Sequence, residues 1–317
     1  MEQHDQHTEK AEEKKPEHAP EQKHEGKNWH DKHYKTLLII PAVLLLVALV
    51  YLFIFYSNHH DIFNKDISLT GGTSATVYTK LDIDKVKTDL SSKLDDISTR
   101  EIFDLVTNEQ KAIVIQTKTD ADTTKKVLEE YLGYKLDASN SSFEYTGATL
   151  SKTFYNQLLF ALLLAFVFMA IVVFILFRTL VPSFAVIFSA FADIVMTLFA
   201  IDLFGMKMSS AGIVAVLMLI GYSVDTDILL TNRVLKRHED TLNHRLLGAF
   251  KTGMTMTLTA IASLGIALFI VRSLSPVLAQ ILTVLLIGLF FDMLNTWITN
   301  VSILKWYAHS KEGKEAK

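Results

Sequence analysis

The sequence of 317 residues contains no cysteine. This absence excludes disulfides, zinc–thiolate sites and iron–sulfur clusters. No basic stripe runs along the chain, so we do not expect a nucleic-acid-binding protein. The enzymatic motifs H-E-x-x-H, G-x-S-x-G and G-x-x-x-x-G-K-[ST] are missing as well. We therefore predict neither an enzyme nor a protein with a metal or an organic cofactor.

Charge is also missing from long stretches of the chain. Of the 31 basic and 34 acidic residues, only four acids lie within six apolar windows. Each window is close to the roughly 20 residues that a helix needs to cross about 30 Å of hydrocarbon. This segregation excludes a soluble globular enzyme. The sequence predicts an α-helical membrane protein with six transmembrane helices, at Leu37–Tyr56, Leu158–Phe177, Ser183–Ile201, Ser210–Leu230, Thr252–Val271 and Val277–Asn300.

Basic residues in the short loops indicate the orientation. They concentrate in the Thr231–Lys251 loop, at Arg178 and at Lys305, and all three places share one side if the spans alternate. The opposite loops hold only Lys207 and Arg272. Because cytoplasmic loops carry the excess of Lys and Arg, we expect both termini in the cytoplasm of a multi-pass cell-membrane protein.

The composition divides the chain into five parts. The first 35 residues are rich in Glu, Lys, His and Gln and are typical of a disordered cytoplasmic tail. Six histidines lie in this tail, but their irregular spacing fits no metal site. The predicted parts are the tail (1–35), a first transmembrane helix (36–56), an extracytoplasmic domain (57–153), a five-helix transmembrane bundle (154–304) and a cytoplasmic tail (305–317).

The extracytoplasmic segment alternates strand and helix patterns. Strands are predicted where β-forming residues gather, and helices where apolar residues recur every three or four positions. The resulting order βαββαβ is that of a ferredoxin-like α+β domain. The predicted strands are Thr73–Thr79, Arg100–Thr107, Lys111–Thr117 and Ser142–Leu150, and the helices are Asp82–Leu94 and Ala121–Leu132.

The four acids inside the spans are the first candidates for function. Asp193 lies near the middle of the third span, Asp225 and Asp292 lie toward the cytoplasmic side, and Asp227 is nearer the cytoplasmic end. An ionised carboxylate at mid-bilayer costs roughly 2.5–3.5 kcal/mol, so such residues mark an ion path by default. The alternative is a protonated Asp with a structural role, bonded to a neighbouring hydroxyl. A cationic partner could come only from Lys251, from Arg233 or from another chain.

Small and hydroxyl side chains surround these acids. Asp292, Asn295, Thr296 and Thr299 share one helix face at i, i+3, i+4 and i+7. The fifth span, Thr252–Val271, is rich in threonine. Because small and hydroxyl residues permit close helix approach and interhelical hydrogen bonds, we expect the fourth, fifth and sixth spans to share a polar core.

Two motifs resemble a known family. The run Ile67-Ser-Leu-Thr-Gly-Gly-Thr73 is similar to a D-F-x-G-G-T element, with Ser68 in place of its Asp, and Gly71, Gly72 and Thr73 match. The Gly-Gly pair favours either a tight bend or a hinge. The longer run Gly221-Tyr-Ser-Val-Asp-Thr-Asp-Ile-Leu-Leu-Thr231 resembles the fourth-helix motif of the SecD/SecF family, closest to the archaeal SecF form.

The resemblance, carried in the fourth span by Gly221, Tyr222 and Ser223, implies a function. Members pair SecD with SecF as two six-helix halves of a resistance-nodulation-division (RND) type assembly. That assembly is thought to use the proton or ion gradient to help unfolded polypeptides emerge from the SecY channel. Asp225 matches the position of the acidic residue in the equivalent SecD motif, so it becomes the first candidate for the coupling group.

Two other functions remain open from the sequence. One is an RND-type transporter of lipids or small hydrophobic molecules, which with a single six-helix half would have to dimerise. The other is a purely structural scaffold for a partner membrane protein, in which the acids serve as interhelical hydrogen-bonding groups.

Overall fold

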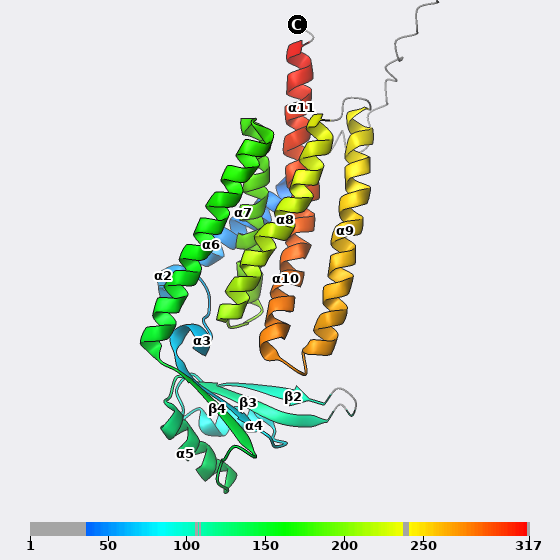
Figure 1. Ribbon diagram of the computed structural model, residues 1–317. Coiled ribbons are helices and arrows are strands. Elements are labelled where there is room, and N and C mark those ends of the chain that lie inside the picture. The colour runs from blue at the N-terminus through cyan, green and yellow to red at the C-terminus, as the bar shows by residue number, and fades with distance from the viewer. Residues whose placement is uncertain (1–35, 105–106, 108, 237–240, 316–317) are drawn as a thin grey trace, which may run out of the picture.

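The computed structural model describes residues 36–104, 107, 109–236 and 241–315. The predicted tail at 1–35, its histidines and part of the 231–251 loop lie outside these residues. The chain forms a helical bundle with a small α+β domain at one end (Figure 1).

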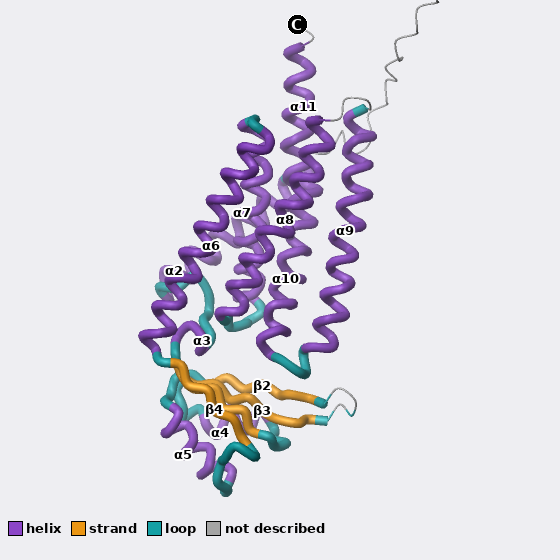
Figure 2. Tube along the Cα trace, viewed as in Figure 1, coloured by secondary structure: helices purple, strands orange, loops and turns teal. Residues whose placement is uncertain are grey.

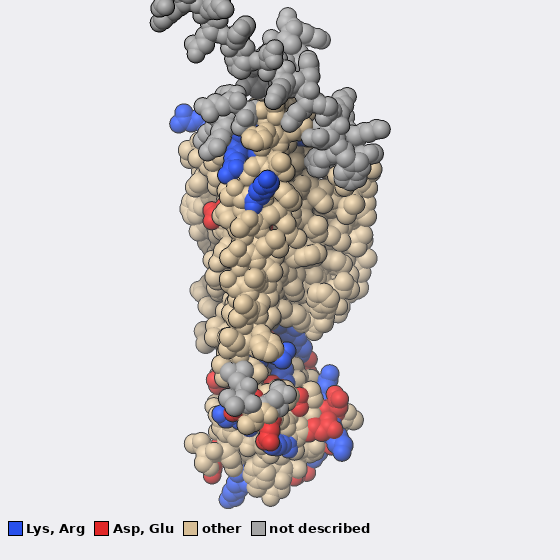
Figure 3. Space-filling model, turned by 90° about the vertical axis from the view of Figure 1, so that its right-hand side faces the viewer, with Lys and Arg blue, Asp and Glu red and all other residues tan. Residues whose placement is uncertain are grey.

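Among the described residues, six helices are long and apolar enough to cross a membrane, which confirms the predicted number. Five of the spans are single α-helices, and the sixth contains a π-helical turn between two α-helices. On the visible face in Figure 3, charged side chains gather at the two ends, and the band between them is almost uncharged. The spans are α2 (Ile39–His59), α6 (Ala148–Phe177), α7 (Leu180–Leu203), α8 (Ser210–Lys236), α9 (Leu242–Val271) and a sixth made of α10 (Pro276–Leu294), the π-helical turn η1 (Asn295–Asn300) and α11 (Val301–Glu315).

The spans differ in how deeply they are buried. In the most apolar stretch of each helix, 61% of the residues of α7 and 56% of those of α8 are buried, against 6% for both α6 and α9. The α10 helix packs against α7, α8 and α9. The centre of the bundle is therefore made by α7, α8 and α10, and the exposed apolar faces of α6 and α9 are available to lipid or to another chain.

The outer domain has the predicted βαββαβ order. Its antiparallel sheet has the strand order β2-β3-β1-β4, and one extra turn of helix, α3 (Ile67–Thr70), precedes the first strand (Figure 2). The expected strand at Ser142–Leu150 was wrong in its last residues: the strand ends at Thr146, and α6 begins at Ala148. The elements are β1 (Gly72–Val77), α4 (Ile83–Leu90), β2 (Ser98–Phe103), β3 (Gln110–Thr117), α5 (Ala121–Leu132) and β4 (Ser141–Thr146).

The two faces of the sheet have different environments because side chains alternate along a strand. The core of the domain forms where Ala75, Val77, Ile113 and Ile115 pack against Val86, Leu90 and Leu128 of α4 and α5. The other face of the sheet carries polar residues such as Ser74, Thr76, Gln116 and Glu144, and it lies toward the bundle.

The Gly71–Gly72 pair makes a close approach possible at the entry to β1. Both residues have positive φ, +84° and +142°. A Cβ added at Gly71 would lie 2.5 Å from the Cα of Ala148, and one at Gly72 would lie 2.3 Å from the carbonyl oxygen of Thr117. The entry to β1 and the start of α6 are thus in direct contact, and this contact explains why both positions are glycine.

Backbone hydrogen bonds join this segment to the α7–α8 loop. The amide of Asp66 donates to the carbonyl of Met208 at 2.9 Å, and the amide of Met208 donates to the carbonyl of Asn64 at 2.7 Å. The amide of Ser210, the first residue of α8, donates to Oγ of Ser68 at 3.1 Å. Ser68, which stands where the family motif has Asp, therefore satisfies one of the free amides at the start of α8.

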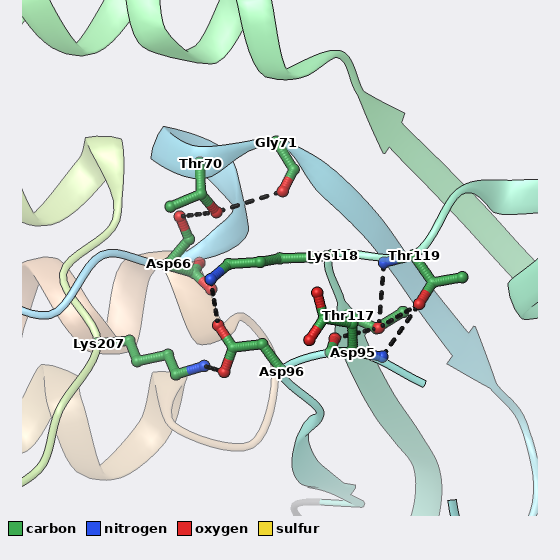
Figure 4. A network of polar contacts seen from close by, with 9 residues as sticks. All are labelled: Asp66, Thr70, Gly71, Asp95, Asp96, Thr117, Lys118, Thr119 and Lys207. Atoms are coloured by element: carbon green, nitrogen blue, oxygen red, sulfur yellow. Dashed lines mark hydrogen bonds and ion pairs between the residues drawn. The ribbon is translucent and has the colours of Figure 1, made fainter. Parts of the chain in front are cut away.

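A second link between the two parts is ionic (Figure 4). The Asp96 carboxylate contacts Nζ of Lys207 at 2.7 Å and Nζ of Lys118 at 3.1 Å. Lys207 belongs to the α7–α8 loop, and Lys118 follows β3. Burial opposes ionisation of Asp96, but hydrogen bonds to the two ammonium groups outweigh it and lower the pKa of Asp96 below its ordinary value.

Candidate functional site

Asp193 is at one end of a buried polar cluster in the centre of the bundle. Its Oδ2 accepts a hydrogen bond from Oγ of Ser223 at 2.6 Å, and its Oδ1 accepts one from Nδ2 of Asn295 at 2.7 Å. Thr197, one turn further along α7, bonds to the backbone carbonyl of Asp193 at 2.6 Å. Side chains from α7, α8 and the sixth span thus meet at this carboxylate.

Asp227 and Asp292 form the other end of the cluster and share one hydroxyl. Oγ1 of Thr296 lies 2.8 Å from Oδ1 of Asp227 and 3.2 Å from Oδ1 of Asp292. Asn300 also donates to Oδ1 of Asp227 at 2.7 Å, and Thr226 lies 3.4 Å from Oδ2 of Asp292. Among the described residues, Oδ2 of Asp227 is buried without a hydrogen-bond partner.

The π-helical turn explains how one helix reaches two acids on two other helices. η1 contains Asn295, Thr296 and Asn300, and all three side chains are buried. Asn295 points to Asp193 on α7, while Thr296 and Asn300 point to Asp227 on α8. Single π-helical turns are found frequently at functional sites, where they re-aim side chains.

The donors that reach the three carboxylates in these contacts are all neutral. They are the hydroxyls of serine and threonine and the amides of asparagine. The two basic residues that could have reached in lie elsewhere: Arg233 donates to Thr252 at 3.0 Å, and Lys251 is exposed. The cluster therefore presents several carboxylate oxygens to a few neutral donors in a low-dielectric interior, an arrangement suited to holding a proton or a cation.

The structure separates the four predicted acids. Asp193, Asp227 and Asp292 are each 0% exposed and lie in one cluster. Asp225 lies on the exposed face of α8 beside Gly221 and Tyr222, two residues from Asp227 and on a different side of the helix.

The motif residues are divided as well. Ser223 belongs to the cluster, whereas Gly71, Gly72 and Thr73 are in the outer domain. Asn300 was not predicted as a site residue, although it is eight positions after Asp292 and so continues the same polar helix face.

The prediction that the fifth span shares the polar core was wrong. Thr252 of α9 accepts from Arg233 of α8, away from the three acids, and two further hydroxyls donate to their own helix: Thr255 to the carbonyl of Lys251 at 2.8 Å, and Thr259 to that of Thr255 at 2.6 Å. The third span, α7, shares the polar core with the fourth and sixth spans, because Asp193 lies on it. The α9 helix meets the sixth span at Gly253, where an added Cβ would lie 2.3 Å from the Trp297 ring.

Comparison with known proteins identifies the family. Residues 125–310 match the sequence family described as protein export membrane protein SecD/SecF, C-terminal. A curated relative from Methanocaldococcus jannaschii, named protein-export membrane protein SecF, is 42% identical over 90% of this chain and 99% of its own length. The chain belongs to the SecD/SecF family. A second SecF relative, from Methanothermobacter thermautotrophicus, is 41% identical over 87% of this chain and 93% of its own.

The SecD/SecF fold is also known from a solved structure. The structure of SecDF, a translocon-associated membrane protein from Thermus thermophilus, superposes with a TM-score of 0.69 at 16% identity. The match covers 89% of this chain but 39% of that one, so this chain spans well under half of the SecDF length. The membrane fold of the SecD/SecF family is therefore confirmed, and the chain is a multi-pass protein-export membrane protein.

Proposed function

We propose that this chain is an accessory subunit of the Sec translocase that works with a SecD-type partner and a SecY-type channel. In this role the buried acids couple an ion gradient, most simply a proton gradient, to the export of unfolded polypeptides. The observation that carries the proposal is the convergence of Asp193, Asp227 and Asp292 from three helices on neutral donors. One of these donors, Thr296, is shared by Asp227 and Asp292.

Three ionised carboxylates cannot share this site without compensation. Each costs roughly 2.5–3.5 kcal/mol in the membrane interior, and mutual repulsion adds to that. The Thr296 hydroxyl has one proton to donate, so it can satisfy only one of the two oxygens that it contacts. If it donates to Asp227, a proton held on Asp292 can in turn be donated to Thr296. A bound proton therefore lets both carboxylate oxygens that contact Thr296 take part in a hydrogen bond.

A change in protonation then has a structural consequence. When the proton leaves Asp292, the single Thr296 proton faces two carboxylate oxygens, and one of the two is left beside the Thr296 oxygen with no hydrogen between them. The least costly response is a shift of α8 against the sixth span, since Asp227 and Thr226 lie on α8 and Asp292 and Thr296 on the sixth span. Such a shift is the step that we propose to link the gradient to movement of the subunit.

The position of Asp225 indicates contact with a partner chain and not with the internal acid cluster. It lies on the exposed face of α8 with Gly221 and Tyr222. A carboxylate facing lipid is costly, so a second membrane protein, or water held between the two, is expected to cover it. A SecD-type six-helix half is the occupant that we propose. The proposed orientation, with both termini in the cytoplasm and the outer domain outside, follows from the basic loops.

The test uses vesicles that contain this chain, SecD and the channel. Export of an unfolded model polypeptide is measured with and without a proton gradient. We expect Asp227→Asn to lose the response to the gradient and to export at the rate seen without one. The matched control is Thr283→Val on α10, whose hydroxyl donates to the Ala279 carbonyl of its own helix. This control should behave as the wild type.

Copurification with SecD separates coupling from a scaffold role. The coupling proposal requires Asp227→Asn to retain SecD while losing the gradient response. A full gradient response in that variant would refute the proposal. Loss of SecD would instead favour the scaffold reading, in which the acids only hold the helices together.

A further inference from the structure

Buried oxygen atoms without hydrogen-bond partners surround Asp227 on three helices. Oδ2 of Asp227 is one of them among the described residues, and the Ser189 hydroxyl of α7 lies beside this carboxyl without completing a hydrogen bond. Two more are Oγ1 of Thr231, one turn further along α8, and Oδ1 of Asn300, whose Nδ2 already donates to Asp227. All four residues are 0% exposed. α7, α8 and η1 thus bring unused hydrogen-bonding atoms to the neighbourhood of one carboxylate.

The row of unpartnered atoms continues to the end of the bundle that we propose to be cytoplasmic. Asn232 of α8 and Thr179 and Ser183 at the start of α7 each have a buried side-chain oxygen without a partner among the described residues. The start of α7 lies at the same end of the bundle as the last turns of α8, because the two helices run antiparallel (Figure 1). Ser183 is about 9 Å nearer this end than Ser189, at 1.5 Å per residue. Thr179 and Asn232 are half-exposed, so the row extends from Asp227 to the surface.

A row of this kind indicates bound water. Buried polar groups in proteins are nearly always paired, either with protein atoms or with ordered water. A buried water typically makes about three hydrogen bonds to groups that would otherwise be unsatisfied. The hydroxyls of Ser189 and Thr231 can both donate and accept, and Oδ1 of Asn300 can accept. Water that contacts these side chains gives a proton or a small cation at Asp227 a polar path.

The outer side of the acid cluster is packed with apolar side chains. Leu219 lies on α8 one turn beyond Ser223, away from Asp227, and is 0% exposed. Its two Cδ atoms contact α10 at Gly288, where an added Cβ would lie 2.4 and 2.6 Å from them. We call the buried residues around this contact the apolar layer. They are Ile201, Ile213, Ala215, Val216, Leu219, Val284 and Leu285.

The polar side chains buried in the outer half of the bundle have partners. Thr197 donates to the backbone carbonyl of Asp193 at 2.6 Å. Ser209 and Gln280 bond to each other, and Gln280 also donates to the carbonyl of Lys207 at 2.6 Å. Within the described residues of α7, α8 and α10, the buried side-chain atoms without a partner therefore all lie between the acids and the proposed cytoplasmic end.

We infer that, in this conformation, the acid cluster exchanges its ion with the cytoplasmic side only. The route is water held by Ser189, Thr231 and Asn300, and the apolar layer around Leu219 and Gly288 closes the cluster to the outer side. The inference rests on the proposed coupling function and adds to it the side of the membrane that the buried acids face. Ser189, Thr231 and Asn300 are positioning residues, since they act through the water that they hold.

The test uses the fact that the chain contains no cysteine. Single cysteines are introduced into the full chain, which is reconstituted with a cysteine-free SecD in vesicles of known orientation. The probe is Ag⁺, a small cation that binds thiolates, added to one side at a time. Thiols that remain free are counted with a maleimide after unfolding. Ser189→Cys and Thr231→Cys should react with Ag⁺ at least about tenfold faster from the cytoplasmic side than from the outer side.

Ala215→Cys is the matched control within the apolar layer. Ala215 lies on α8 and is 0% exposed, like Thr231. A cysteine there is a small apolar side chain among others, so it should react slowly with Ag⁺ from both sides. Copurification with SecD checks that each variant is folded. If Ala215→Cys folds poorly, Val216→Cys in the same layer replaces it, and Ser189→Cys and Thr231→Cys serve as independent reports on the route.

Two results would overturn the inference. One is that Ser189→Cys and Thr231→Cys resist Ag⁺ from the cytoplasmic side as strongly as the control does. The other is that Ala215→Cys reacts from the outer side as fast as Thr231→Cys reacts from the cytoplasmic side.

Failure of this inference can be told apart from failure of the coupling proposal, because Ag⁺ accessibility is measured without export. A full gradient response in Asp227→Asn, together with reactive cysteines at 189 and 231, would remove the coupling role and leave the water route. A lost gradient response in Asp227→Asn, together with unreactive cysteines at both positions, would leave the coupling role and remove the route.

Discussion

The contact between Gly253 of α9 and Trp297 of η1 allows a quantitative test of the packing around the acids. Gly253→Ala adds one methyl group where the ring atoms Cζ2 and Cη2 of Trp297 would lie 2.3 and 2.8 Å from it. Trp297 is 8% exposed and cannot move freely. Overpacking of this kind costs typically about 1–3 kcal/mol.

Gly265 on the same helix is the matched control. An added Cβ there would meet nothing within 4 Å. Replacing glycine by alanine inside a helix favours the helix by about 0.8–1.0 kcal/mol, and this gain applies at both positions. The difference in unfolding free energy between Gly253→Ala and Gly265→Ala therefore isolates the packing penalty. We expect Gly253→Ala to be the less stable by about 1–3 kcal/mol.

The assay is reversible unfolding of the full chain in mixed detergent micelles, followed by tryptophan fluorescence. A displaced Trp297 should also change the emission of the folded state in Gly253→Ala alone. Because Trp297 follows Thr296, this variant should in addition weaken the gradient response of the reconstituted complex. Equal stability of the two alanine variants would show that α9 does not approach the π-helical turn as described, and it would refute the reasoning.

Three further predictions concern the outer domain and its attachment. Ser68→Asp should stabilise the protein by about 0.3–1 kcal/mol in thermal unfolding, since a carboxylate at the start of α8 interacts favourably with the helix dipole, and Ser68→Ala should destabilise it. The lowered pKa of Asp96 means that its contribution to stability is present at neutral pH and is lost as the pH falls below about 4. The melting temperature of Asp96→Asn should therefore fall less with decreasing pH over that range than the melting temperature of the wild type. Gly72→Ala should lower the yield of folded protein sharply, because its φ of +142° and the 2.3 Å approach to Thr117 leave no room for a methyl group; Gly147→Ala, with open space around it, should fold normally.

The sequence predicts the span number and the outer domain well because both depend on local signals. Runs without charge identify the membrane helices, and the alternation of strand and helix patterns identifies the βαββαβ domain. The first turns of α6 escaped prediction because Ala148–Asn156 is polar. A helix that begins outside the membrane shows no hydropathy signal there.

The membership of the acid cluster is harder to predict. Residues two apart on a helix point in different directions, so Asp225 and Asp227 had to lie on different faces. Which face is inside is not encoded by hydropathy, since lipid-facing and interior side chains in a membrane are both apolar. The threonines of α9 mislead for a related reason: a hydroxyl can bond to its own helix, so its presence does not require a neighbour.

The two connections between the sheet and the bundle pass through a single point. Gly71 touches Ala148, and only Gly147 separates β4 from α6. With the order β2-β3-β1-β4, the far edge of the sheet is three strand spacings away, or about 14 Å. A rotation of 10° about this point would move β2 by about 2.4 Å while β4 barely moves. For any such rotation, β2 would be displaced most and β4 least, and the ion pair between Asp96 and Lys207, just before β2, would resist that displacement.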